Sequence, residues 1–340
     1  MAEGRKILYF IGAGASRAIG ASAPVEGRGR IPIPTQTDFW PVFLRLVRHS
    51  KARADIESFL FRYFLGYRRP PYRIHVKERR RLLATVEVEE VFTFLSERSR
   101  APSTSLQLRT YSMRMWETLV QQVAFVFSHF QANRTTRATV RRFHKRHIRT
   151  YDTVISFNYD TIFENSLPRG TRWAYHGIDD SKDSLPILKP HGSINWERTI
   201  GGIALVSTAK RPVIVAPTHL KFVGSGQGSP SSHGYLDQAP QIRSIWEEME
   251  REMRAAKLLV FIGYSFPVAD LYFSSVLRTT LADREGPPDV VIVNPDAVSI
   301  ADRLQRRFPI PHIAKYFDFG QFIEAGRQGV QRAVRAISAA

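Results

Sequence analysis

Runs of apolar residues alternate with stretches of helical periodicity at the beginning and over the second half of this 340-residue chain. Residues 7–11, 258–262 and 290–293 are uniformly apolar, as expected of parallel strands that are buried on both faces. An amphipathic pattern over residues 241–256 predicts a helix before the second of these strands. Weaker signals predict strands at 153–157, 187–189, 213–215 and 313–317, and helices at 268–281, from 297 and at the C-terminal end.

This alternation predicts an α/β fold, a Rossmann-like doubly wound parallel sheet. Residues 38–149 interrupt the alternation with helical patterns and with no strand of comparable quality. We therefore expect residues 1–36 and 151–340 to form a Rossmann-like domain, and residues 37–150 to form a large, basic helical insertion.

Two loops are expected outside the regular elements. Residues 21–34 are rich in Gly, Pro and Ala and predict a mobile loop rather than a second strand. Residues 224–234, rich in Gly, Ser and Pro, predict a loop or flap. The aromatic residues between positions 59 and 67 are typical of a core or of a subunit contact.

The net charge of +18 predicts an anionic partner or a large basic surface. Residues 118–151 contain no acid, and their basic side chains are Arg134, Arg137, Arg141, Arg142, Lys145, Arg146 and Arg149. His144 and His147 lie in this run at a spacing of three, but no carboxylate is near them in sequence. A solvated basic face is therefore favoured over a metal site.

The chain has no cysteine, which excludes disulfides, a thiolate nucleophile and every zinc ribbon built on paired cysteines. No apolar run approaches the roughly 18 to 20 residues that a membrane-spanning helix needs. Residues 1–6 lead directly into the first predicted strand without a cleavable apolar segment. We expect a cytoplasmic protein that does not enter a membrane.

The first predicted strand ends in a glycine loop with the sequence GAGAS at residues 12–16. Glycines at positions 12 and 14 remove two side chains where backbone N–H groups would approach an anion, and Ser16 is placed to cap the next turn. The usual dinucleotide fingerprint has a third glycine where this chain has Arg17. Alone, the loop fits a turn that closes a buried strand as well as it fits a nucleotide site.

Polar side chains also follow the later predicted strands, and in a doubly wound sheet ligands bind at the carboxyl ends of the strands. Asn158 and Asp160 follow one strand, two residues apart and on the same side. His191 follows the next strand. The turn at residues 263–265 adds a hydroxyl suited to a phosphate or ribose, and Asn294 adds a carboxamide for a ribose hydroxyl.

Taken together, these loops resemble a sirtuin-type NAD-consuming domain. Their order matches too, and the resemblance covers residues 7–34 and 153–296, leaving the insertion outside. The residues that carry it are Gly12, Ala13, Gly14 and Ser16 for the GAGxS loop, Asn158 with Asp160, His191 with Gly192 and Ser193, Gly263 with Ser265, and Asn294.

Two features depart from the sirtuin deacylases: the four-cysteine zinc ribbon is absent, and Phe157 stands where a glutamine usually precedes the asparagine. Both features are shared with prokaryotic sirtuin-like proteins of anti-phage defence, which segments 189–196, 214–218 and 263–267 also resemble. The resemblance implies an NAD hydrolase that cleaves the nicotinamide–ribose bond to nicotinamide and ADP-ribose and acts in bacterial anti-phage defence by NAD depletion. NAD is then the substrate, and no zinc is expected.

The resemblance also implies roles for individual residues. Asn158 would position the ribose and the attacking water, Asp160 would orient the nicotinamide carboxamide, and His191 would act as general base. The residues expected to hold the diphosphate are Gly12, Ala13, Gly14 and Ser16, and those expected on the adenosine side are Gly263, Ser265 and Asn294. Asp38 resembles part of the segment that follows the glycine loop in the family, or it is a helix N-cap.

Two other classes of function stay open on the sequence alone. One is a binding module that senses NAD or ADP-ribose, and the other is a nucleic-acid-binding regulatory subunit that uses the basic run. Protein deacylation fits less well. The resemblance further implies a homo-oligomer and a HerA-type hexameric ATPase as partner. We expect residues 59–67 and 118–151 at subunit or partner contacts, and nucleic acid as a ligand of the latter.

Overall fold

The computed structural model describes residues 6–25, 29–47, 50–68, 71–101, 103–215, 240–268 and 270–338. A seven-stranded sheet forms its centre, and every pair of neighbouring strands is parallel. The strands in spatial order are β12 (Ile313–Tyr316), β11 (Asp289–Val293), β10 (Leu258–Ile262), β1 (Ile7–Ile11), β4 (Thr153–Ser156), β6 (Leu185–Leu188) and β5 (Trp173–Tyr175). The predicted α/β class and doubly wound sheet are confirmed.

The central strands form because their side chains are apolar in every position and are buried on both faces. β1 and β10 pair in register from Ile7 with Leu258 to Ile11 with Ile262. Phe10 and Phe261 stack across this pair with ring centroids 4.4 Å apart. The pairing brings the carboxyl ends of β1 and β10 level, so the loops after them lie side by side.

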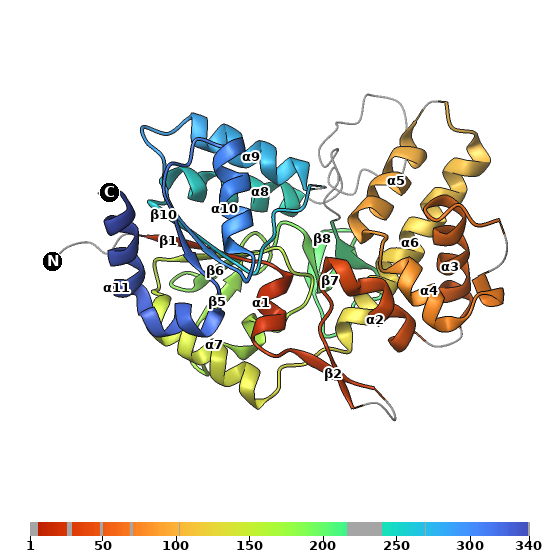
Figure 1. Ribbon diagram of the computed structural model, residues 1–340, viewed down its shortest axis with the longest axis horizontal. Helices are drawn as coiled ribbons and strands as arrows, with labels where there is room; N and C mark the ends of the chain where they lie inside the picture. Colours follow the sequence, from red (N-terminus) through yellow and green to blue (C-terminus); the bar gives the residue numbers. More distant parts are fainter. Residues whose placement is uncertain are drawn as a thin grey trace.

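Helices cover both faces of the sheet (Figure 1). One group comprises α8 (Pro240–Ala255), α9 (Leu271–Ala282) and α10 (Ala297–Arg307), and the other comprises α1 (Ala13–Ala18), α7 (Arg134–His147) and α11 (Phe319–Ser338). After β1 the chain crosses towards β4, whereas after β10 it crosses towards β11. The order of the sheet therefore reverses between β1 and β10, and such a reversal is where doubly wound sheets bind ligands.

The helical part of the chain lies beside the sheet (Figure 1). It contains α2 (Phe39–Leu46), α3 (Lys51–Tyr63), α4 (Val76–Leu83), α5 (Val88–Arg100) and α6 (Leu106–Ser128). α7 also lies within the predicted insertion, but it packs on the sheet: Phe143 contacts Tyr9 of β1 and Phe322 of α11. The division of the chain into two domains stays a prediction.

Two small sheets differ from the expectation. Residues 21–34 contain an antiparallel hairpin of β2 (Ser22–Pro24) and β3 (Arg30–Pro32) instead of a loop alone. The predicted strand near residue 213 is real, but β9 (Pro212–Ile214) pairs antiparallel with β7 (Gly192–Thr199), which also pairs with β8 (Gly202–Leu205). It does not join the central sheet because it returns to β7 without a crossover helix. The predicted flap at 224–234 lies outside the described residues.

The described helices include none with both the length and the apolar composition needed to cross a membrane.

Candidate active site

A cavity of about 510 Å³ lies at the carboxyl ends of β1, β4, β10 and β11. Loops that follow these strands line one part of it. The helical part of the chain lines another, through side chains of α5 and α6, namely Val88, Glu89, Phe92, Val123 and Phe127. The cavity is therefore bounded both by the sheet and by the segment that the sequence predicted to be an insertion.

The two glycine turns of the sequence pack directly against each other beside this cavity. A Cβ atom on Gly12 or Gly14 would lie 2.6 or 2.8 Å from the Gly263 carbonyl oxygen, and one on Gly263 would lie 2.0 Å from the nitrogen of Ala15. The N–H groups of Gly12 and Gly14 donate to the carbonyls of Ile262 and Gly263, both at 2.9 Å. Contrary to the expectation, these two N–H groups are already paired, and glycine is needed for the contact between the turns.

Asn158, Ser16 and Asp160 form one buried hydrogen-bond network. Asn158 Nδ2 donates to the Gly12 carbonyl at 3.1 Å and to Ser16 Oγ at 3.0 Å, and Ser16 Oγ donates to Asp160 Oδ2 at 3.1 Å. Asn158 and Asp160 line the cavity, whereas Ser16 lies behind them and does not. Ser16 therefore braces two cavity side chains, which is a different position from the diphosphate contact expected of it.

Asp160 is held at its backbone as well as at its carboxylate. The fully buried Lys189 donates from Nζ to the Asp160 carbonyl at 2.6 Å and pairs with Glu164 Oε1 at 2.8 Å. The Ile162 N–H donates to Asp160 Oδ1 at 3.0 Å. Burial raises the pKa of Asp160, and the positive charge of Lys189 partly opposes this rise. The carboxyl group is thus fixed in place and shifted towards its protonated form.

His191 lies in the same cavity, next to a carboxylate that the sequence did not single out. Its Nε2 is 3.6 Å from Asp270 Oδ2, which also accepts the Tyr264 hydroxyl at 2.7 Å. The imidazole packs against Phe157, with ring centroids 5.0 Å apart, and Phe157 stacks on Tyr264 at 4.6 Å. Phe157 is therefore part of the aromatic wall that fixes the histidine.

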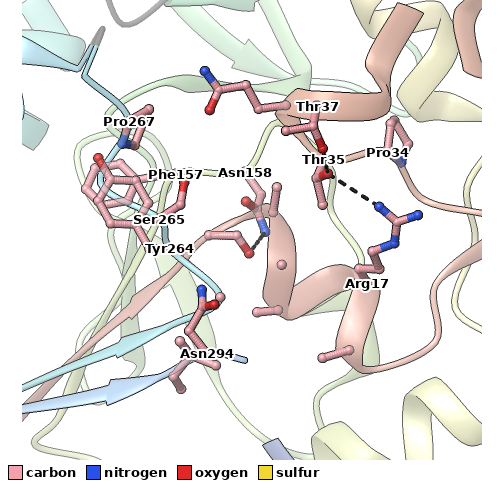
Figure 2. A pocket seen from close by; sticks show the side chains of 18 of the residues that line it. Arg17, Pro34, Thr35, Thr37, Phe157, Asn158, Tyr264, Ser265, Pro267 and Asn294 are labelled. Carbon is pink, nitrogen blue, oxygen red and sulfur yellow. Dashed lines mark hydrogen bonds between the residues drawn. The ribbon is translucent and has the colours of Figure 1, made fainter. Parts of the chain in front are cut away.

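Ser265 and Asn294 line the cavity at the ends of β10 and β11 (Figure 2). Asn294 Oδ1 accepts the Asp296 N–H at 3.0 Å, an interaction that shapes the turn before α10. Ala13 and Gly263 also line the cavity. The structure thus brings to one cavity all the residues predicted from the sequence except Ser16 and Asp38.

Asp38 lies one side chain away from the cavity and holds Arg17, which lines it. The Asp38 Oδ2 atom is 2.8 Å from the Arg17 NH2 nitrogen, and Oδ1 accepts the Thr35 N–H at 2.7 Å. Asp38 is therefore part of a capping box with Thr35 and is also the partner of Arg17. Arg17 stands where the usual dinucleotide fingerprint has its third glycine. Its side chain points towards Thr35 at the edge of the cavity (Figure 2).

Glu89 also lines the cavity, and no sequence pattern predicts it there. It lies in the first turn of α5, and its Oε2 atom is buried with no hydrogen-bond partner in the described part of the chain. Burial raises its pKa to about 7, and the charges of Glu87 and Asp270 contribute to the rise. No motif surrounds Glu89, because only the folding of the helical segment over the sheet brings it to the site.

The two histidines of the basic run do not share one environment. His147 is buried, stacks on Phe322 and lies 3.0 Å from the Phe322 carbonyl through Nε2, so the solvated face expected for it is wrong. No group of three or more His, Asp or Glu residues that is suited to a metal occurs among the described residues.

In the aromatic stretch at residues 59–67, Phe59 and Phe61 are core residues, while Tyr67 is exposed.

No protein-family model and no curated protein matches the chain. Among solved structures, a mutant Sir2 homologue in complex with ADP-ribose aligns at 15% identity with a TM-score of 0.41, covering 98% of this chain and 94% of that chain. A Sir2 homologue–NAD complex also aligns at 15% identity and a TM-score of 0.41, covering 98% of this chain and 91% of that one.

Proposed function

We propose that the chain is an NAD hydrolase that breaks the bond between nicotinamide and ribose. The observation that supports this most is the meeting of Asn158, Asp160 and His191 around one cavity, at the point where the sheet reverses its order. Asn158 and Asp160 follow β4, and His191 follows the neighbouring strand β6. Each motif taken alone is also compatible with an ordinary turn. A cavity of about 510 Å³ is also within the usual size range of small-molecule sites.

Cleavage requires a leaving group, a nucleophile and a proton acceptor. The C1′–N bond breaks, its electron pair leaves with nicotinamide, and the ribose becomes cation-like until a water oxygen bonds to C1′. The proton that this water loses is assigned to His191, which is fixed between Phe157 and Asp270. The products are nicotinamide and ADP-ribose.

Asn158 and Asp160 have distinct tasks in this proposal. Both amide protons of Asn158 are directed at Gly12 and Ser16, which leaves Oδ1, with no hydrogen-bond partner among the described residues, as an acceptor for a ribose hydroxyl or the attacking water. Asp160, which is fixed by Ser16 and by the Ile162 N–H, is assigned to orient the nicotinamide carboxamide. Ser265 and Asn294 are assigned to the adenosine side, where they line the cavity.

The test is to incubate the purified chain with NAD and to measure nicotinamide release by chromatography, alone and with candidate partners. We expect release that Asn158→Ala and His191→Ala abolish while ADP-ribose binding is kept. If NAD binds tightly and no nicotinamide appears under any condition, the chain is an NAD or ADP-ribose sensor and the hydrolase proposal is wrong. Equal cleavage by both variants and the wild type would contradict the residue assignment.

The cellular role and the partners are further parts of this proposal. We place the chain in anti-phage defence, acting by NAD depletion as a cytoplasmic homo-oligomer, with a HerA-type ATPase as a candidate partner. The basic side chains of α7 support an anionic ligand such as nucleic acid, since Arg134, Arg137 and Arg141 are exposed. Only Arg142 and Arg146 of this helix pair with Glu324 among the described residues.

A further inference from the structure

The cavity has an unusual charge balance for a protein of net charge +18. Arg17 is the only Lys or Arg among its described lining residues, whereas five lining residues are acidic. These acidic residues are Glu89, Asp160, Asp270, Asp296 and Asp318. A ligand that carries a diphosphate would bring further negative charge into this space, so a counter-charge within the cavity is required.

Part of the glycine loop's backbone is already hydrogen-bonded within the protein. The N–H groups of Gly12, Gly14 and Ala15 donate to the carbonyls of Ile262, Gly263 and Gly12, each at 2.9 Å. Three of the donors that a phosphate would use in an open glycine loop are therefore already paired. These three groups cannot donate to an anion, and a charged side chain would add what they do not supply.

Arg17 has the position and the free donors for this task. Its guanidinium carries five N–H donors, and the described residues take two of them, one through Asp38 at 2.8 Å and one through Thr35 at 3.4 Å. Asp38 is in turn fixed by the Thr35 N–H at 2.7 Å. The side chain is 37% exposed, so the held guanidinium can still be reached by a ligand.

We propose that Arg17 binds the diphosphate of the nucleotide ligand, and that Asp38 and Thr35 position its guanidinium for that contact. The inference rests on the proposed function, because it takes NAD and ADP-ribose as the ligands. It also assigns a function to the residue that breaks the usual glycine fingerprint. Arg17 replaces, as a charged fork, the backbone donors that the packed glycine turns have lost.

The alternative is that Arg17 and Asp38 form only a structural ion pair. A pair exposed to this extent adds little to stability, so its removal would change unfolding only slightly. A diphosphate contact has a different signature, because its removal weakens only ligands that contain the diphosphate. The two interpretations therefore separate in a binding experiment.

The experiment is calorimetric titration of the full chain and of Arg17→Ala with ADP-ribose and with adenosine, which lacks the diphosphate. We expect Arg17→Ala to weaken ADP-ribose binding by about 10- to 100-fold, as removal of a charge-assisted contact should, and to leave adenosine binding within about twofold. Arg332→Ala, which removes the same charge from the exposed face of α11, should change neither affinity.

The outcomes distinguish failure of the proposed function from failure of the Arg17 inference alone. If the wild type does not bind ADP-ribose, the proposed function is wrong and the Arg17 inference fails with it. If the wild type binds ADP-ribose and Arg17→Ala binds it equally well, only the Arg17 inference is overturned. Should Arg17→Ala fail to fold, Arg17→Gln keeps a long polar side chain and loses the charge, and an unchanged ADP-ribose affinity in that variant would overturn the inference.

Discussion

His191 Nε2 lies 3.6 Å from Asp270 Oδ2, and the same carboxylate oxygen accepts the Tyr264 hydroxyl at 2.7 Å. The histidine is thus oriented by a carboxylate that lies just before α9 in the sequence. Asp270 also caps that helix by accepting the Phe273 N–H at 3.4 Å. The contact between His191 and Asp270 therefore links the proposed proton acceptor to the start of α9.

Asp270→Asn tests the orienting role of this carboxylate. The amide keeps the size and the helix cap but removes the charge next to the imidazole, so we expect cleavage of NAD to fall by about 10- to 100-fold. Thermal unfolding and ADP-ribose affinity should change little. Asp283→Asn, at the other end of α9, is the matched control and should cleave NAD at the wild-type rate. An unchanged rate in Asp270→Asn would remove Asp270 from the mechanism.

Ser16→Ala tests the buried network behind Asn158 and Asp160. The variant removes the acceptor of the Asn158 amide and the hydroxyl that Asp160 accepts, so both side chains lose a fixed orientation. We expect the turnover of NAD to fall by about tenfold or more, with a loss of about 1–3 kcal/mol of unfolding free energy because buried polar atoms lose partners. Turnover kinetics and urea unfolding measure the two effects. Full activity in a variant of reduced stability would show that Ser16 is structural only.

Gly263→Ala tests the contact between the two glycine turns. The new Cβ would lie 2.0 Å from the Ala15 nitrogen, and Gly263 has a φ of +61°, which disfavours side chains. We expect a loss of more than about 3 kcal/mol in unfolding free energy, measured by urea denaturation. Gly286→Ala, where a Cβ meets nothing within 4 Å, should stay within about 1 kcal/mol of the wild type. Equal stability of the two variants would contradict the packing described here.

The raised pKa of Glu89 makes stability depend on pH. Its pKa is about 7 in the folded chain against an ordinary value of 4.5, so the folded state holds the proton more tightly than the unfolded state. This contribution is fully present below pH 4.5 and is lost as pH rises through about 7. The loss amounts to roughly 3 kcal/mol.

Glu89→Gln, which mimics the neutral acid, removes this dependence. Compared with the wild type, the variant should be more stable at pH 8 and similar at pH 4.5, as measured by urea unfolding at both values. The neighbouring acids Glu87 and Asp270 remain in both proteins, so the difference isolates Glu89. A difference between the two proteins that does not change with pH would contradict the raised pKa.

The central sheet could be predicted because its main strands are recognisable from their apolar residues alone. Residues 7–11 and 258–262 are apolar throughout, and only burial on both faces explains such runs. The hairpin of β2 and β3 was missed because its strands are three residues long and contain proline. β7 was missed because Gly192–Thr199 mixes polar and apolar residues, and its pairing with β9 is set by tertiary contacts.

Some residues of the candidate site could also be predicted from the sequence, and others could not. Asn158 and His191 could be located because they directly follow predicted strands, and strand ends meet at one edge of the sheet. Glu89 could not, because its place depends on how α5 folds over that edge. In the sequence, Arg17 is notable only because it stands where the dinucleotide fingerprint has a glycine. Its proposed contact with the diphosphate follows from the structure, in which the N–H groups of Gly12 and Gly14 are already paired.

The most direct test of the central claim is the fate of the oxygen in the product. The chain is incubated with NAD in ¹⁸O-labelled water, and nicotinamide and ADP-ribose are quantified by mass spectrometry, with Asn158→Ala as the control. We expect equal amounts of nicotinamide and ADP-ribose, with one heavy oxygen in each ADP-ribose, and no product from the variant. Wild-type nicotinamide release without the heavy oxygen, or equal release by Asn158→Ala, would contradict hydrolysis at this cavity.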